Sequence, residues 1–215
     1  MSYIAERRQE EKDRRRNEIV DAAEELYREV GWDAVTMDAV ARRARLSRAL
    51  VYVYFKDKSD LHFAIAVRAM ERLHRDFLEA AQHAKTGADK IRAIGLAYIK
   101  YAEEFPHYFD ACARLELHTP SDSEPTPQEM LCFEASKLPH EVAIEALRVG
   151  QADGSIRADI GDLAVTARVL WGFSHGLIQV AMTKGAVLSR VGIAVPQLTQ
   201  QAMDLLTYAL TGRND

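Results

Sequence analysis

A serine between two glycines is the arrangement in this chain that most resembles a catalytic motif. Residues 172–176, Gly-Phe-Ser-His-Gly, fit the G-x-S-x-G pattern of a hydrolase nucleophile elbow. That motif requires a strand before the serine and a helix after it, but here it lies within a long apolar stripe of helical period. We therefore interpret Gly172 and Gly176 as helix-packing residues, and we expect no catalytic residue and no enzymatic activity. The alternative is a helical enzyme or small-molecule-binding protein that uses Ser174, His175 or His118.

The histidines and cysteines do not form a metal-binding pattern. The histidines show neither the helical spacing of two ligands on one turn nor cysteines at zinc-finger spacing nearby. They are His62, His74, His83, His107, His118, His140 and His175. Cys112 and Cys132, in a chain without an export signal, indicate reduced thiols rather than a disulfide. We expect no metal and no cofactor.

Positive charge is concentrated in one short segment, although the net charge of the chain is −4. Between Arg42 and Lys58, six basic residues stand against Asp57 alone, which gives this segment a net charge of +5. The overall charge argues against a protein that coats nucleic acid indiscriminately, whereas a basic segment of this density indicates contact with a phosphate backbone.

A second basic cluster lies near the N-terminus, between residues 7 and 16. Its six basic residues are interleaved with Glu6, Glu10, Glu11 and Asp13. The interleaving favours a solvated helical start, with a DNA-contacting arm as the alternative.

The segment that contains the first basic run has the layout of three short helices. Apolar residues recur at three- and four-residue steps before Gly31, which ends the first helix as a C-cap. Thr36 and Ser47 are good N-caps for a second helix and for a third that ends near Phe55. Two short helices with a three-residue link form a helix-turn-helix, whose second helix fits the major groove.

Beyond this segment the periodicity stays helical. A fourth helix opens at Asp57 or Ser59 and joins the two parts of the chain, and a fifth and a sixth meet at Pro106. Thr126 and Glu129 form a capping box for a seventh helix, in which Pro139 predicts a kink or a break. The last two helices are expected at residues 163–184 and 196–211. No strand pattern is present, so we expect an all-α fold of about nine helices.

Residues Arg15 to Leu61 resemble the N-terminal domain of the TetR family of bacterial transcriptional regulators. Beyond Leu61 only the helical layout and the length agree. The residues that carry the resemblance are Ile19, Ala22, Ala23, Leu26, Gly31, Thr36, Ala41, Ser47, Tyr52, Tyr54, Phe55, Lys58 and Leu61. The resemblance implies a helix-turn-helix DNA-binding domain over residues 1–58 and a helical bundle over residues 59–215 that binds a ligand and forms a homodimer.

The resemblance also implies roles for residues of the helix-turn-helix. Thr36 would touch a phosphate, the helix from Ser47 to Tyr54 would read the groove, and Lys58 would anchor the backbone. Free backbone N–H groups at both helix starts favour phosphate independently. Arg48 could discriminate guanine by about 1–3 kcal/mol, with phosphate as its alternative partner. The residues predicted to bind DNA are Thr36, Arg45, Ser47, Arg48, Ala49, Tyr52, Tyr54 and Lys58.

Two residues depart from the family pattern. Arg45 stands where a turn glycine is usual, so it must either adopt a left-handed conformation or reshape the turn, and it brings a positive charge near DNA. Leu50 stands where a small hydroxyl residue is usual, and it could contact a thymine methyl or fill a gap in its own domain.

Aromatic residues gather in the helices that surround a ligand cavity in the resembled family. Each of them is also compatible with ordinary core packing, whereas the group favours a pocket with polar residues that orient a ligand. The predicted pocket residues are Tyr98, Tyr101, Phe105, Tyr108, Phe109, Arg114, His118, Phe133, Trp171 and His175.

The last two helices carry apolar or small residues on two faces, which indicates dimerisation. The predicted interface residues are Gly172, Gly176, Leu198, Ala202, Leu205 and Ala209. The dimer would place two recognition helices about 34–36 Å apart on palindromic operator DNA. A small-molecule effector would tilt the fourth helix and change this spacing. We expect the regulator to be a repressor, with an activator that uses the same DNA-binding domain as the alternative. No signal peptide or long uncharged apolar run is evident, so we expect a cytoplasmic protein that does not enter membranes.

Overall fold

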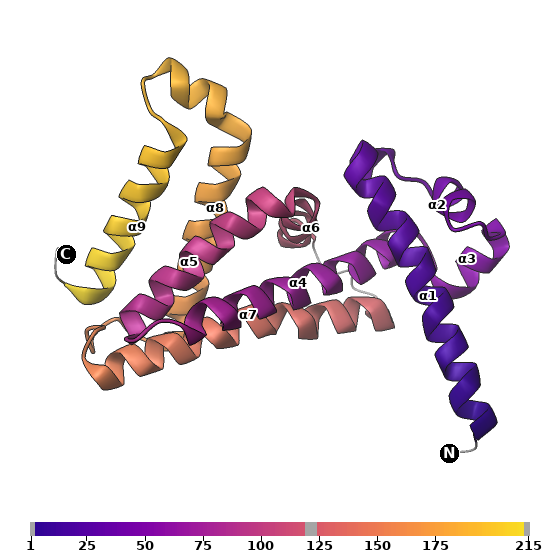
Figure 1. The fold of residues 1–215 in the computed structure, drawn as a ribbon, viewed down its shortest axis with the longest axis horizontal. Helices are drawn as coiled ribbons and strands as arrows, with labels where there is room; N and C mark the ends of the chain where they lie inside the picture. The colour runs from indigo at the N-terminus through magenta and orange to yellow at the C-terminus, as the bar shows by residue number, and fades with distance from the viewer. Residues whose placement is uncertain (1–2, 119–123, 213–215) are drawn as a thin grey trace. The chain divides into compact units, whose positions relative to one another are not determined.

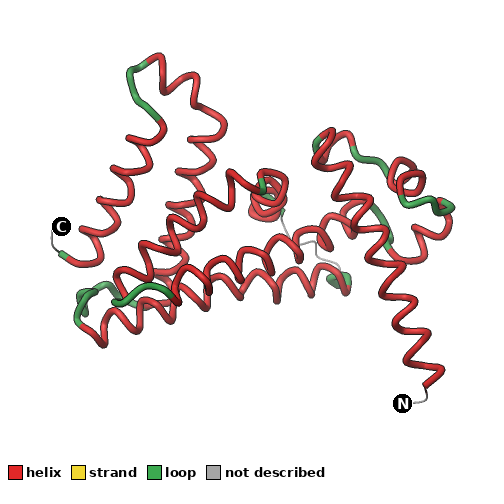
Figure 2. The backbone as a smooth tube through the Cα atoms, viewed as in Figure 1, coloured by secondary structure: helices red, strands yellow, loops and turns green. Residues whose placement is uncertain are grey.

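The computed structural model describes residues 3–118 and 124–212, and it contains helices and loops but no strand within those ranges (Figures 1 and 2). Nine α-helices and one 3-10 helix follow one another along these residues. They are α1 (Tyr3–Val30), η1 (Trp32–Ala34), α2 (Met37–Arg43), α3 (Arg48–Tyr54), α4 (Lys58–Gln82), α5 (Gly87–Glu104), α6 (Pro106–Glu116), α7 (Pro127–Asp153), α8 (Leu163–Arg190) and α9 (Val195–Thr211). The all-α prediction is confirmed.

Local chemistry explains where several helices begin and end. Gly31 ends α1 with a φ of 76°, a left-handed value that a glycine adopts without steric cost. Thr86 opens α5 with a capping box, in which its hydroxyl accepts from the Asp89 N–H while the Asp89 carboxylate accepts from the Thr86 N–H. The predicted cap of α7 is also present, because Thr126 Oγ1 accepts a hydrogen bond of 3.1 Å from the Glu129 N–H.

The structure excludes a break in α7 at Pro139, which is one of the two outcomes that the sequence predicts there. Proline lacks an N–H group and clashes with the preceding turn, so the sequence predicts a kink or a break there. Instead, α7 continues through Pro139 to Asp153 without interruption. Pro139 is buried beside the apolar residues of its neighbours, and this packing outweighs the loss of one backbone hydrogen bond.

The chain divides into two compact units, which we call unit 1 and unit 2. Unit 1 comprises residues 1–69 and 107–134, and unit 2 comprises residues 70–106 and 135–215. Helices α4 and α7 contribute residues to both units. These units are defined by contacts alone. The assignment of DNA binding to residues 1–58 and of ligand binding to residues 59–215 stays a prediction.

Unit 1 is built on a core from α1, the helix-turn-helix, the start of α4 and α6. Ile19 and Ala23 of α1, Val51 of α3 and Leu61 of α4 are fully buried in it, and Ala111 of α6 joins them. Burying apolar side chains from all these helices holds the helix-turn-helix as a rigid body.

Unit 2 has its own core, in which Leu73, Tyr98 and Leu147 are almost completely buried. The start of α5 approaches α7 so closely that a Cβ on Gly87 would collide with the backbone of Gly150. Gly87 is therefore needed where these helices meet, whereas a Cβ on Gly150 would collide with the side chain of Ile156, which follows α7.

Among the described residues, no single helix has both the length and the apolar content to cross a membrane, although the bent pair of α8 and α9 meets that test jointly. No group of three or more His, Cys, Asp or Glu side chains in residues 3–118 and 124–212 could hold a metal ion. Cys112 and Cys132 are free and buried.

Candidate nucleic-acid interface and cavity

Both helices of the helix-turn-helix start at the predicted capping residues. Thr36 Oγ1 accepts from the Ala39 N–H at 3.2 Å, and Ser47 Oγ accepts from the Leu50 N–H at 3.2 Å. Both hydroxyl residues are exposed, and other N–H groups of each first turn stay open to a partner. Each helix start is therefore suited to receive a phosphate oxygen.

The turn between α2 and α3 passes through Arg45 in a left-handed conformation. The φ of Arg45 is 57°, and no other non-glycine residue in the described ranges has a positive φ. The turn is closed by a 2.9 Å hydrogen bond from the Leu46 N–H to the Ala41 carbonyl. The sequence allowed either a left-handed Arg45 or a reshaped turn, and the structure shows the left-handed Arg45. The Arg45 side chain is exposed.

The outer face of α3 presents the predicted groove-reading residues. Arg48, Ala49 and Tyr52 are exposed on it, whereas Val51 is buried in the core. The Arg48 guanidinium lies 5.5 Å from the centre of the Tyr52 ring, and its Nε is 3.0 Å from Asp38 of α2. This ion pair connects α3 to α2. Because it is exposed to solvent it is weak, so Arg48 can leave Asp38 to contact DNA.

Three other positions of α3 differ in how far they are exposed. Tyr54 is half-buried and packs against the core of unit 1, so part of its side chain fixes the position of α3 and only the rest is open to DNA. Leu50 is also half-buried. Val53 is 75% exposed on the same helix and was not predicted, although it follows Ala49 by one helical turn and could have been found from that spacing. An exposed valine at this place is suited to contact a thymine methyl.

Lys58 lies at the first residue of α4, and its ammonium group already has partners. Nζ donates to the Asp33 carbonyl at 3.2 Å and lies 4.9 Å from the centre of the Trp32 ring. Burial lowers the pKa of Lys58, and the nearby Asp33 carboxylate opposes that shift. To anchor a phosphate, as the family resemblance implies, Lys58 must share or leave these contacts.

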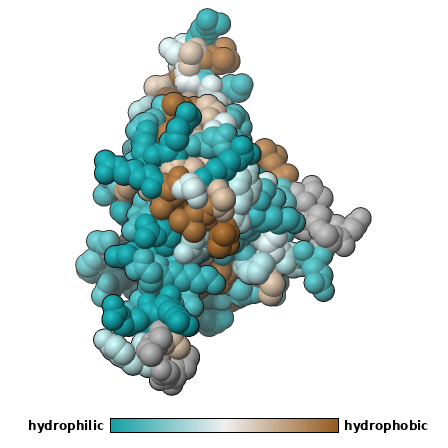
Figure 3. All heavy atoms as spheres, turned by 90° about the vertical axis from the view of Figure 1, so that its right-hand side faces the viewer, coloured by the Kyte–Doolittle hydropathy of each residue, from teal (hydrophilic) through white to brown (hydrophobic). Residues whose placement is uncertain are grey.

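The face that contains α2 and α3 is largely hydrophilic, with one apolar area in its middle (Figure 3). Arg42, Arg45 and Arg48 are exposed within the basic segment that sequence analysis singled out. A surface of this composition is typical of a protein that binds the DNA backbone and reads its grooves.

Unit 2 contains a small cavity of about 60 Å³ among α4, α5, α7, α8 and α9. Its lining is mainly apolar and includes Phe77, Ile91 and Trp171, with Arg92 and His140 among the few polar groups. Tyr98 lies at its wall, where its hydroxyl is 2.7 Å from His175 Nδ1 and its ring stacks on Trp171 at 4.8 Å.

The structure brings together only part of the predicted pocket. Tyr98 and Trp171 line the cavity, His175 contacts both of them, and Tyr101 packs against Tyr98 and Phe105. The other five predicted residues belong to unit 1 and do not line this cavity: Tyr108, Phe109, Arg114, His118 and Phe133.

These five residues have other surroundings for physical reasons. The Tyr108 hydroxyl donates to Glu24 of α1, and Arg114 pairs with Asp33 of η1 and with Asp110 of its own helix, so both residues join α6 to the segment that precedes the helix-turn-helix. Phe109 is buried, His118 lies 3.1 Å from Glu129, and Phe133 is 64% exposed. Sequence reasoning missed Arg92, His140 and Met203 of the cavity, because helical spacing alone did not show which helices meet there.

Ser174 lies in the middle of α8, and no strand precedes it in the described chain. The backbone around it therefore lacks the strand-turn-helix geometry of a nucleophile elbow.

The predicted dimerisation residues fall mainly on exposed positions of α8 and α9. Gly172, Gly176, Leu205 and Ala209 are exposed, Leu198 is half-buried, and Ala202 is only 5% exposed because it packs within its own subunit. A Cβ added to Gly172 or Gly176 would meet no atom within 4 Å. These glycines are thus not required for packing among the described residues of the chain itself.

Comparison with known proteins gives a match over the helix-turn-helix. Residues 19–65 match the family described as bacterial regulatory proteins, tetR family. The chain is 28% identical over 92 residues to the HTH-type transcriptional activator FasR of Mycolicibacterium smegmatis, which covers 43% of this chain and 42% of FasR. The chain thus spans less than half the length of the curated relatives that it matches.

Solved structures share the fold over most of the chain. A protein of unknown function from Rhodococcus sp. RHA1 superposes with a TM-score of 0.73 and 23% identity over 92% of this chain and 95% of its own. The transcriptional regulator FadR from Bacillus subtilis, solved in complex with stearoyl-CoA, gives a TM-score of 0.66 and 18% identity over 90% of this chain and 98% of its own. Residues 19–65 of this chain are thus similar to the tetR family of bacterial regulatory proteins, and the fold is shared with a solved structure over 92% of the chain.

Proposed function

We propose that this protein is a transcriptional regulator that acts in the cytoplasm. Its homodimer binds a palindromic operator and represses transcription until a small molecule binds. Activation would use the same DNA interface, and the relative FasR is named as an activator. The position of the operator relative to the promoter decides between the two outcomes.

The observation that carries this proposal is the exposed face of α3. Two hydroxyl caps, an exposed arginine and an exposed tyrosine occupy a helix-turn-helix whose apolar side is buried in unit 1. An ordinary helical hairpin has no need of this concentration of positive charge on its outer face.

The first experiment is selection of binding sites by the purified protein from random duplex DNA at near-physiological salt. A homodimer is expected to enrich a palindrome with half-sites about one helical turn apart, because its two recognition helices are related by a two-fold axis. Folded protein that enriches no sequence would contradict sequence-specific DNA binding.

The role of Arg48 is tested on the selected site with Arg48→Ala. We expect a loss of about 1–3 kcal/mol of discrimination at one base pair of each half-site, because a bidentate contact to guanine is removed. Arg148→Ala is the matched control, since Arg148 is an exposed arginine of unit 2 that pairs with Glu145 on its own helix. An Arg48→Ala protein that weakens equally on all sequences would assign Arg48 to phosphate instead.

For the effector, we propose an apolar molecule with a polar end. The apolar lining of the cavity, with Arg92 and His140 as polar groups, supports this chemistry, and FadR of Bacillus subtilis was solved with stearoyl-CoA. A cavity of about 60 Å³ is too small for such a chain, so helices of unit 2 must separate when the effector binds. That movement would be transmitted along α4 and would change the spacing of the recognition helices.

Titration of the operator complex with stearoyl-CoA tests this proposal, with coenzyme A alone as the control. We expect the acyl compound to release labelled DNA, measured by fluorescence anisotropy, and the control to leave the complex intact. Release by neither compound would exclude a long-chain acyl-CoA as the effector while leaving DNA binding unaffected.

A further inference from the structure

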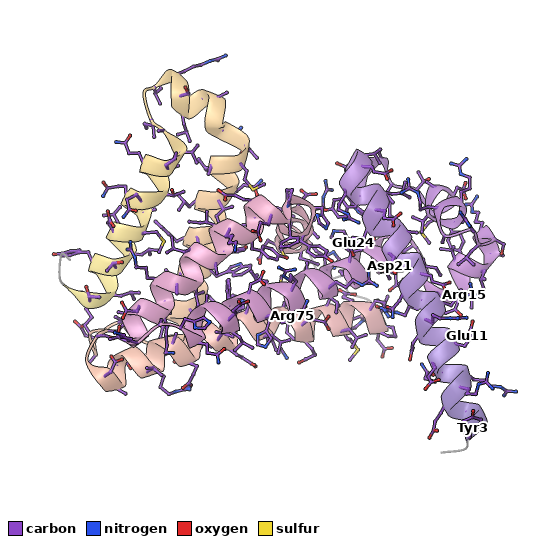
Figure 4. The ribbon with its side chains drawn as sticks, viewed as in Figure 1. Tyr3, Glu11, Arg15, Asp21, Glu24 and Arg75 are labelled. Atoms are coloured by element: carbon purple, nitrogen blue, oxygen red, sulfur yellow. The ribbon has the colours of Figure 1, made fainter. Side chains whose placement is uncertain are left out.

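The N-terminal half of α1 extends beyond the core of unit 1. The first fully buried residue of α1 is Ile19, and the described side chains before it are exposed or half-buried. Tyr3, Glu11 and Arg15 mark this part of the helix in Figure 4. At about 1.5 Å per residue, the fifteen or so residues before Glu18 form a rod of about 22 Å.

Charge is segregated around this rod, although it looks mixed in the sequence. Arg8, Lys12 and Arg15 follow one another at four- and three-residue steps, so they share one face of α1, and Ile19 continues that face into the core. We call these three residues the basic stripe. Arg7 and Arg14 lie on the outer face, with Glu10, Glu11 and Glu18 around them.

Fewer of the positive charges on the basic stripe are neutralised by ion pairs with carboxylates than on the outer face. Arg14 is paired with Glu11 at 2.5 Å and approaches Glu18 at 3.9 Å, and Arg15 also shares these two carboxylates. Arg8 and Lys12 form no ion pair or hydrogen bond with any described side chain. Two exposed cations one helical turn apart are thus available to an external partner.

Arg16, the residue that follows the basic stripe in the sequence, lies beside the end of the recognition helix α3. The Arg16 guanidinium lies 5.4 Å from the centre of the ring of Phe55, the residue that caps the C-terminal end of α3. Arg16 also donates to Gln128 and is therefore held in unit 1. From this point the rod carries Lys12 and Arg8 about 6 and 12 Å further along α1.

We propose that the basic stripe binds the phosphate backbone of the DNA that flanks the sequence read by α3. The proposal rests on the proposed function, since it adds a contact surface to the same DNA interface. Backbone phosphates recur every 3.4 Å or so along one strand, so a row of cations of this length can face several of them. The acidic outer face would be repelled by the same backbone, which fixes the orientation of the rod.

The test compares two double variants on a duplex of about four helical turns (about 10.5 base pairs each) that carries the selected site. Arg8→Gln/Lys12→Gln removes two cations from the basic stripe, and Arg7→Gln/Arg14→Gln removes two from the outer face. Affinity is measured between about 50 and 200 mM salt for both variants and the wild type. Circular dichroism and thermal melting check that α1 stays helical and unit 1 stays folded.

We expect the stripe variant to have a salt slope that is shallower by about 0.9 for each phosphate that it no longer binds, whereas the outer-face variant keeps the wild-type slope. When salt rises from about 50 to 200 mM, a protein that binds one phosphate fewer therefore loses about 3.5-fold less affinity than the wild type does. Equal slopes for the stripe variant and the wild type, or equal shifts in both variants, would overturn the proposal. A wild-type protein without salt-dependent DNA binding would instead overturn the proposed function itself.

Discussion

Arg45 combines a conformational cost with a charge that is suited to DNA binding. Its left-handed φ of 57° costs an ordinary residue about 1–2 kcal/mol, because Cβ approaches the following carbonyl oxygen. The exposed guanidinium lies in the turn between the two helices of the helix-turn-helix, where a positive charge is near any bound phosphate.

We predict that Arg45→Gly makes the protein more stable and weakens DNA binding. Relief of the left-handed strain outweighs the greater flexibility of unfolded glycine, so the expected gain is about 0.5–1 kcal/mol in urea unfolding. The salt slope of DNA binding should become shallower by about 0.9 per subunit if each subunit then binds one phosphate fewer. Arg45→Ala is the control, because it removes the charge but keeps the strain. Equal stabilisation by alanine would show that strain is not the cause.

At the residue scale, sequence predicted what depends on near neighbours. Thr36 and Ser47 cap N–H groups three residues away, and Gly31 ends its own helix, so each role can be derived from a few adjacent residues. The partners of Lys58 could not be predicted in this way. The Asp33 carbonyl lies 25 positions earlier and reaches Lys58 only because η1 folds back on the start of α4.

At the scale of elements, α6 is joined to α1 and η1 by a set of polar contacts within unit 1. The Tyr27 hydroxyl donates to Asp110 at 2.6 Å, and the Tyr108 hydroxyl donates to Glu24 at 2.8 Å. Arg114 adds a two-bond contact to Asp33 at 2.9 and 3.0 Å. Helix periodicity located α6 but not these partners, because they are more than 80 residues away in the chain.

Glu24 is the central group of this connection. Burial opposes its ionisation, but the nearby His107 ring together with hydrogen bonds from Tyr108 and Arg68 outweighs burial and lowers its pKa from 4.5 to about 2. Of these three, Tyr108 and Arg68 have the shorter contacts, since His107 Nε2 is 3.6 Å from the carboxylate. The ionised form of Glu24 therefore stabilises the folded state at neutral pH.

We predict that Glu24→Gln destabilises unit 1 in a pH-dependent manner. Because the folded pKa lies below the unfolded one, the ionised carboxylate contributes fully above about pH 4.5, and its contribution is lost as the pH falls toward 2. Urea unfolding should show a deficit of about 2–3 kcal/mol at pH 7 that shrinks between pH 4.5 and 2. Glu25→Gln is the neighbouring control, since Glu25 is exposed and pairs with Arg43, and its effect should stay below about 1 kcal/mol. A deficit that is independent of pH would assign the effect to packing.

At the scale of the whole molecule, α8 presents an apolar stripe to solvent. Val165, Val169, Phe173 and Val180 recur at steps of three to four residues or their multiples, and each is more than 40% exposed. A folded single subunit gains nothing by exposing such a row of side chains, and large exposed apolar patches mark interaction surfaces. The open faces of Gly172 and Gly176 lie on the same stripe, where another helix could approach closely. Sequence patterning predicts an interface on α8 through Gly172 and Gly176, because apolar or small residues occupy two faces of this helix.

We predict that Val169→Glu converts the proposed homodimer into monomers. The substitution would place two carboxylates near the two-fold axis, where they would lose hydration and repel each other, whereas a single subunit would keep the glutamate in water. Sedimentation velocity at micromolar concentration is the measurement, with Leu96→Glu as the control on another exposed apolar position, in α5. The Val169→Glu protein should also lose its preference for a palindrome over a single half-site, because two recognition helices would no longer be linked. A Val169→Glu protein that stays dimeric, or a Leu96→Glu protein that dissociates, would move the interface away from the apolar stripe of α8.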